Sequence, residues 1–136
     1  MTPTTLARIH AAAFTQTRAW SSKEFADLLP HRGMILCGDV RSFILGRIIG
    51  DEAEVLTLAT HPDHQRQGHA RTQLLTFLRQ VHTLTAATVF LEVAENNKLA
   101  KSLYFNEGFH LVGHRPRYYK TTDGNQIGAD ILRLTF

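Results

Sequence analysis

The segment Gln65–Arg71 (Gln-Arg-Gln-Gly-His-Ala-Arg) carries residue types that can hold a phosphate group. It follows an apolar, strand-like stretch, residues 55–60, and opens a stretch with helical apolar spacing, residues 70–81. A loop between a strand and a helix aims several backbone N–H groups at one point, where the positive end of the helix dipole also stabilises an anion. The glycine lets a phosphate approach the backbone closely, and the two arginines supply charge. The segment therefore predicts a phosphorylated ligand.

One carboxylate interrupts an almost continuously apolar run. Glu92 lies in the run 88–93 (Thr-Val-Phe-Leu-Glu-Val), which predicts a central strand buried on both faces. A carboxylate in that place must be paired, protonated or directed into a cavity. Glu92 is therefore either a structural ion-pair partner, a strand-end residue that reaches solvent, or a general base at the carboxyl end of a strand, where α/β sheets bind ligands.

Five other residues each allow a structural and a functional interpretation. Tyr104 has the helical spacing of a core aromatic, but its hydroxyl would reach a leaving group if its helix lines the same cleft. Asn97 precedes that helix as an N-cap or donates a hydrogen bond to a ligand. Trp20 is a hydrophobic staple for a following helix or a substrate contact. Tyr118 and Tyr119 serve sheet packing or substrate contact.

The eight histidines prompt a search for a metal site. The segment His61-Pro62-Asp63-His64, with His69 close behind, offers three ligands. Its proline and aspartate indicate a turn, however, and no cysteine or second histidine pair accompanies it, so we expect no metal. The other histidines are scattered and are predicted to be surface residues: His10, His31, His82, His110 and His114.

The composition is that of one cytoplasmic domain. A chain of 136 residues with 43% hydrophobic content can build one core, so we expect a single domain over residues 1–136. No apolar run reaches the length of about 18 residues that a membrane-spanning helix needs, and the N-terminal residues lack the features of a secretion signal. A single cysteine, Cys37, fits a reducing compartment and a packing role. The net charge of +3 is dispersed, so it gives no strong signal for nucleic-acid binding.

The apolar patterns and turn residues predict the element order ααβββαβαββ. A capping box at Ser21 and Glu24 begins the second helix, and Asp123-Gly124 forms the last turn. The predicted helices cover residues 6–14, 21–29, 70–81 and 97–108, and the predicted strands cover 34–38, 42–49, 54–60, 88–93, 109–119 and 129–135. The first three strands form an antiparallel meander. This order implies an α/β fold with a mixed, largely antiparallel sheet and helices on both faces.

Together these segments resemble the GNAT acyltransferases. The family signature, [Arg/Gln]-x-x-Gly-x-[Gly/Ala], is met by residues 65–70. Further similar segments extend over nearly the whole chain: Trp20-Ser21, Leu58-Ala59-Thr60, Leu91-Glu92-Val93, Asn97, Leu103-Tyr104-Phe105 with Gly108-Phe109, and Tyr118 to Gly124. Within the family the chain resembles the RimI branch, which acetylates the N-terminal α-amino group of a ribosomal protein.

The resemblance implies a GNAT fold, acetyl-CoA as co-substrate, and direct transfer of acetyl to an amine in a ternary complex. It assigns Glu92 as the base and Tyr104 as the acid. Its implied contacts with coenzyme A come from Leu58, Ala59 and Thr60, from Arg66, Gln67, Gly68, His69, Ala70 and Arg71, and from Asn97. Trp20, Tyr118 and Tyr119 are the candidate contacts for the acceptor.

Two departures from the family pattern bear on the ligands. His69-Ala70 replaces the usual Leu-Gly or Ile-Gly pair, and the hairpin from Asp123-Gly124 to Asp130 is longer than in the RimI branch. Because that hairpin borders the acceptor site, the alternatives to a protein N-terminus are a small amine, an antibiotic or an aminoacyl-tRNA. Outside enzymes, the chain could be a silent acyl-CoA-binding module or a ribosome-associated basic protein. The presence of both candidate catalytic residues weighs against the first, and the dispersed charge weighs against the second.

Overall fold

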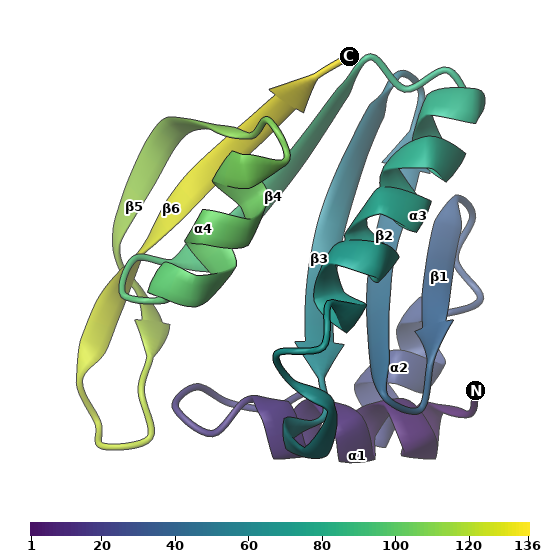
Figure 1. The fold of residues 1–136 in the computed structure, drawn as a ribbon. Coiled ribbons are helices and arrows are strands. Elements are labelled where there is room, and N and C mark those ends of the chain that lie inside the picture. The colour runs from purple at the N-terminus through teal and green to yellow at the C-terminus, as the bar shows by residue number, and fades with distance from the viewer.

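Six strands form one sheet in the order β1-β2-β3-β4-β6-β5, in a computed structural model that describes residues 1–136 (Figure 1). The helices are α1 (Pro3–Ala13), α2 (Ser22–Leu28), α3 (His69–Thr83) and α4 (Lys98–Asn106). The strands are β1 (Met34–Asp39), β2 (Ser42–Ile49), β3 (Glu52–Thr60), β4 (Thr88–Ala94), β5 (His110–Lys120) and β6 (Gln126–Thr135). The predicted order is confirmed, and only β3 and β4 are parallel neighbours.

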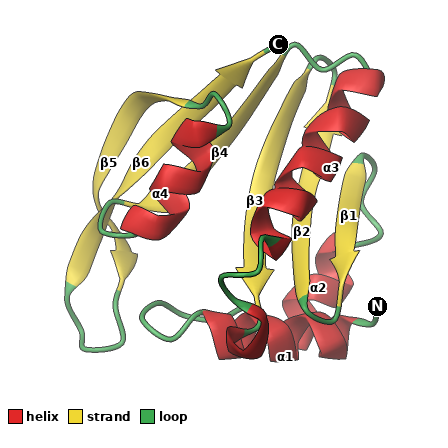
Figure 2. Cartoon of the chain, viewed as in Figure 1, coloured by secondary structure: helices red, strands yellow, loops and turns green.

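Helices cover both faces of the sheet, as predicted (Figure 2). A core of 17 buried residues lies on the side of α3 and α4, and it includes the apolar face of α3. A second core of six buried residues joins α1 and α2 to β2 and β3. Cys37 is buried in the larger core, in agreement with its predicted packing role. No helix is both long and apolar enough to cross a membrane.

The start of α2 follows the predicted capping box. Ser21 Oγ accepts a hydrogen bond from the Glu24 backbone N–H at 3.2 Å, and the Glu24 carboxylate accepts one from the Ser21 backbone N–H at 3.1 Å. Trp20, one residue before the cap, packs against Phe25 with 5.5 Å between ring centroids. Trp20 is therefore a hydrophobic staple, which fixes the angle at which the chain enters α2.

β3 and β4 separate halfway along their length. They pair only over Glu52–Val55 and Thr88–Leu91. Immediately beyond, Leu56 is an extra residue in β3 without a partner in β2, which makes a β-bulge. The bulge reverses the alternation of faces, so that Val55 lies in the core under α3 whereas Ala59 lies in the core with α1 and α2. Because a bulge bends and twists its strand, β3 turns away from β4 at this point.

Two predictions of burial are wrong. β4 is not buried on both faces, because Val89, Leu91 and Val93 are buried whereas the alternate residues are only partly covered. The physical reason is that α1 and α2 pack on β2 and β3 and leave this face of β4 without a helix. His10 is not a surface residue, since only 2% of it is exposed. It lies four residues after Leu6, on the same apolar face of α1.

Candidate active site

The predicted phosphate loop leads into the one helix that no side chain caps. Thr2, Ser21 and Asn97 cap the other helices, whereas the N-cap of α3 is Gly68, with a φ of 81°. Arg66 also has a positive φ, of 61°. A Cβ placed on Gly68 would meet nothing within 4 Å, so the space above it is open. The first N–H groups of α3 lack intrahelical partners and face this space, which is the arrangement that binds anions.

The two arginines of the loop differ in their surroundings. Arg71 Nε donates to Glu107 Oε1 at 2.7 Å, and this ion pair ties the start of α3 to the end of α4. Arg66 is exposed and makes no ion pair, so it is the cation of this loop that remains available to a ligand. The His69 ring, which replaces an aliphatic residue of the family pattern, is hydrogen-bonded to the Gln67 side chain at 3.2 Å.

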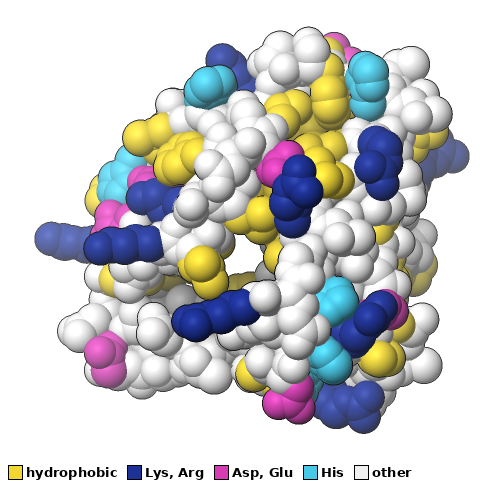
Figure 3. All heavy atoms as spheres, viewed as in Figure 1, with side chains coloured by type: hydrophobic (Ala, Val, Ile, Leu, Met, Phe, Trp, Pro, Cys, Tyr) yellow, Lys and Arg dark blue, Asp and Glu magenta, His cyan; other side chains and the backbone are white.

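The end of β3 presents an open edge. Leu58, Ala59 and Thr60 pair with β2 on one side and lie beyond the segment that pairs with β4 on the other. Figure 3 shows the molecule hollowed between the part that contains α3 and the part that contains α4. An extended amide chain can add to such an edge as a further strand.

Glu92 lies on β4 just after the last residue that pairs with β3. Its carboxylate oxygen Oε1 is 3.0 Å from Nε of Arg115, and 24% of its side chain is exposed. Both structural interpretations of Glu92 are thus present, because it is ion-paired and also reaches solvent. Its partner, a strand arginine, was not predicted. The only sequence feature that could have indicated Arg115 is its position three residues before the tyrosine pair.

Tyr118 and Tyr119 approach each other because β5 is irregular. The register with β6 shifts between Arg115 and Tyr119, and Arg117 has a φ of 54°. Consecutive strand residues normally point to opposite faces, but here the two rings lie 5.0 Å apart. The charge of Glu92 raises the pKa of Tyr118, and burial together with that charge raises the pKa of Tyr119 to about 12. Arg115 connects the pair to Glu92, because its guanidinium carbon also lies 5.3 Å from the centroid of the Tyr118 ring.

Tyr104 combines a buried ring with an accessible hydroxyl. Only 6% of the residue is exposed, and its ring packs edge-on against Phe109 at 5.6 Å. Burial, with a smaller contribution from Tyr119, strongly raises the pKa of its hydroxyl. No protein group forms a hydrogen bond with this hydroxyl. Every fully buried side-chain nitrogen or oxygen atom in the structure has a hydrogen-bond partner. The oxygen therefore touches accessible space, so the core and functional interpretations of Tyr104 are compatible.

Asn97 and Trp20 have clear structural roles. Asn97 Oδ1 accepts from the Ala100 backbone N–H at 3.2 Å, which leaves its amide nitrogen as a donor. The Trp20 backbone N–H donates to Nδ1 of His10 at 3.0 Å. The histidines near the loop form a turn, in which His61 Nδ1 accepts from the Asp63 backbone N–H at 3.1 Å. No group of three or more His, Cys, Asp or Glu residues is arranged to hold a metal ion.

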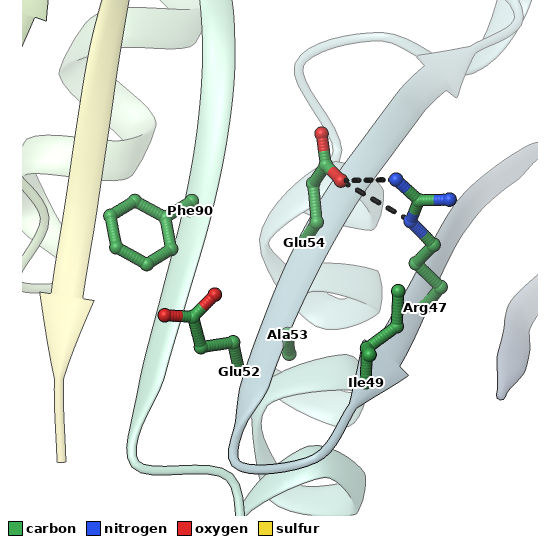
Figure 4. A pocket seen from close by; sticks show the side chains of 6 residues that line it. All are labelled: Arg47, Ile49, Glu52, Ala53, Glu54 and Phe90. Carbon is green, nitrogen blue, oxygen red and sulfur yellow. Dashed lines mark hydrogen bonds and ion pairs between the residues drawn. The ribbon is translucent and has the colours of Figure 1, made fainter.

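A separate basin of about 420 Å³ lies on the face of the sheet opposite α3. Figure 4 shows its lining, in which Arg47 is ion-paired with Glu54, and Phe90 lies beside Glu52. It contains none of the predicted site residues. Phe90 and Glu92 share one face of β4, so the basin adjoins the candidate base.

Comparison with known proteins identifies the fold and the chemistry together. The profile of the acetyltransferase (GNAT) family matches residues 6–109. The chain belongs to the GNAT acetyltransferase family. It is therefore an N-acetyltransferase, and acetyl-CoA is its co-substrate. The ribosomal protein bS18-alanine N-acetyltransferase of Escherichia coli K12 is 34% identical over 111 residues, which cover 79% of this acetyltransferase and 75% of that enzyme.

Solved structures agree with this assignment. The crystal structure of the ribosomal-protein-S18-alanine N-acetyltransferase from Escherichia coli superimposes with a TM-score of 0.88 at 30% identity, over 98% of this acetyltransferase and 86% of that chain. Arabidopsis thaliana NAA60 in complex with acetyl-CoA shares the fold, with a TM-score of 0.81 at 16% identity, over 96% of this acetyltransferase and 91% of that chain. The predicted GNAT fold is thereby confirmed.

Proposed function

We propose that this acetyltransferase transfers acetyl from acetyl-CoA to the N-terminal α-amino group of a ribosomal protein of the bS18 type. The similarity to the Escherichia coli enzyme supports the acceptor class. The observation that carries the chemistry is the cluster formed by Glu92, its ion-pair partner Arg115 and the adjoining Tyr118–Tyr119 pair, beside the point where β3 and β4 separate. A carboxylate near two phenol groups, where two strands of the sheet separate, suits the binding of an amine.

The chemistry of the amine favours an N-terminus over a lysine. The attacking nitrogen must be neutral, and at pH 7 deprotonation of an α-amine costs about 1 kcal/mol. Deprotonation of a lysine side chain costs about 3.4 kcal/mol more. A single carboxylate is a weak base, so Glu92 is better matched to the α-amine.

In the proposed reaction the amine nitrogen attacks the thioester carbon while Glu92 accepts the amine proton, through a water molecule where the two are separated. The ion pair with Arg115 fixes the Glu92 carboxylate on the face of β4 that Phe90 shares. As the carbon–sulfur bond breaks, the Tyr104 hydroxyl donates to the sulfur. A phenol is protonated at neutral pH, and burial raises the pKa of this hydroxyl further.

Acetyl-CoA fits the groups that remain unpaired around the cleft. The N–H groups at the start of α3 would bind the pyrophosphate, with Gly68 giving room and Arg66 adding charge. The open edge of β3 at Leu58–Thr60 would pair with the pantetheine arm. The free amide nitrogen of Asn97 would donate to the same ligand.

A thiol-release assay with acetyl-CoA tests the proposal. The acceptors are polyamines, aminoglycosides and a peptide with the N-terminal sequence of bS18 from the organism that encodes this acetyltransferase. The matched control is the same peptide with a blocked N-terminus and a free lysine. We expect turnover of the free peptide alone, with mass spectrometry locating the acetyl group on its α-amine. Turnover of the polyamines or aminoglycosides alone, or of no peptide, would refute the proposed acceptor.

A further inference from the structure

His10 takes no part in the proposed chemistry, yet both of its ring nitrogens are engaged. The Trp20 backbone N–H donates to Nδ1 at 3.0 Å, and Nε2 lies 3.0 Å from Thr57 Oγ1. A backbone N–H can only donate, so Nδ1 carries no proton. The proton of the neutral ring is therefore on Nε2, which donates to the Thr57 hydroxyl. Burial lowers the pKa of His10 to about 4, so this neutral form persists at neutral pH.

Aromatic rings fix the plane of the imidazole. Phe14 stacks on it at 4.1 Å with an interplanar angle of 7°, and Trp20 stacks on it at 5.4 Å. Phe25 meets it edge-on at 5.8 Å. Since the rotation of the ring is fixed by these contacts, its two hydrogen bonds hold their partners in fixed positions. His10 thus joins α1, the segment before α2, and β3 just after the bulge.

The segment between α1 and α2 also contacts the β5–β6 hairpin. Thr17 and Thr121 form an isolated β-bridge, and the Thr122 backbone N–H donates to the Gln16 carbonyl at 2.9 Å. The hairpin directly continues the strand that carries the tyrosine pair near Glu92. A continuous series of contacts therefore leads from His10, through residues 14–20, to the wall of the acceptor site.

We propose that His10 is a positioning residue for acceptor binding, which fixes the backbone at Trp20 and thereby holds residues 14–20 and the β5–β6 hairpin beside Glu92. The inference rests on the proposed function for its acceptor. The hydrogen bond accepted by Nδ1 is the essential contact, because it acts on the segment that contacts the hairpin. The bond from Nε2 to Thr57 anchors the ring to the sheet.

Two variants separate these contacts. In His10→Asn the amide oxygen takes the place of Nδ1 and can accept from Trp20, whereas the longer side chain of His10→Gln reaches Thr57 and has no acceptor at the Nδ1 position. KM values are measured for the bS18 N-terminal peptide and for acetyl-CoA. We expect His10→Gln to raise the peptide KM about tenfold, the effect of one lost hydrogen bond, and His10→Asn to raise it about twofold. The KM for acetyl-CoA should stay unchanged in both variants.

Fluorescence supplies a measurement that needs no acceptor. Trp20 is the only tryptophan of the chain, and it stacks on His10, so its emission reports directly on this contact. We expect the emission of His10→Gln to shift to the red and that of His10→Asn to resemble the wild type. Equal emission in the two variants would overturn the inference. An equal rise of the peptide KM in His10→Gln and His10→Asn would also overturn it. A wild-type enzyme that leaves the peptide unmodified would overturn the proposed function instead, while the fluorescence still tests the positioning of Trp20.

Discussion

The burial of His10 predicts a specific loss of stability in mild acid. Burial lowers the pKa of His10 from 6.5 to about 4, against the raising effect of Glu24 and the further lowering effect of Arg18. As the pH falls below 6.5, the unfolded chain binds a proton at this histidine while the folded protein does not. The stabilisation is therefore complete above the unfolded value and is lost as the pH falls toward the folded value.

The size of the effect follows from the two pKa values. Each pH unit between them costs about 1.4 kcal/mol, and integration from pH 7 to pH 5 gives a loss of about 2 kcal/mol in the free energy of unfolding. Seven other histidines are present, so the contribution of His10 is isolated by comparison with a variant that lacks only this one. The ion-paired carboxylates Glu24, Asp39 and Asp130 have pKa values lowered by their partners, and their contributions begin to be lost only below about pH 5.

Urea unfolding followed by circular dichroism at pH 7 and pH 5 measures this loss in the wild type and in His10→Asn, which cannot titrate at this position. The variant should be less stable at pH 7, and its stability should change by about 2 kcal/mol less than that of the wild type between the two pH values. An equal loss in both proteins would show that His10 titrates normally and would refute the reasoning.

Four further substitutions test the candidate site and the core. Tyr104→Phe should keep the affinity for acetyl-CoA and lower kcat about 10- to 100-fold, because the proton donor is lost. The loss stays within this range because a thiolate is a stable leaving group, and an unchanged kcat would remove Tyr104 from catalysis. Glu92→Gln should lower kcat/KM about 100-fold and flatten its acid limb, whereas a pH profile identical to the wild type would mean that the amine loses its proton to bulk water. Gly68→Asp should abolish acetyl-CoA binding in calorimetry, because it strains a backbone with φ of 81° and adds negative charge at the start of α3; retained binding would contradict the phosphate cradle. Gly46→Ala should lower the free energy of unfolding by about 1–3 kcal/mol, because its Cβ would meet the Phe77 ring and the Glu54 carbonyl, while kcat per folded molecule should not change; unaltered urea unfolding would show that the core can adjust.

Local sequence was sufficient for the elements and for the loop that opens α3. The capping box at Ser21 and the N-cap at Asn97 mark helix starts because their hydrogen bonds join residues only three apart. Gly68 was identifiable because a strand, a glycine-containing loop and a helix follow one another directly. The apolar patterns predicted the antiparallel meander because its strands are neighbours in sequence and are joined by short turns.

Contacts between distant residues were decided by the tertiary structure alone. Arg115 and Glu92 form an ion pair across β6, which the strand order places between β4 and β5, and the two tyrosines come together because β5 is irregular. His10 had the helical spacing of a core residue, but its polarity suggested the surface until Thr57, 47 residues away, and Trp20 supplied its hydrogen-bond partners. Residue types and local spacing thus determined which groups could do chemistry. The long-range pairing of strands and the bulge at Leu56 decided where those groups meet, because no local interaction specifies them.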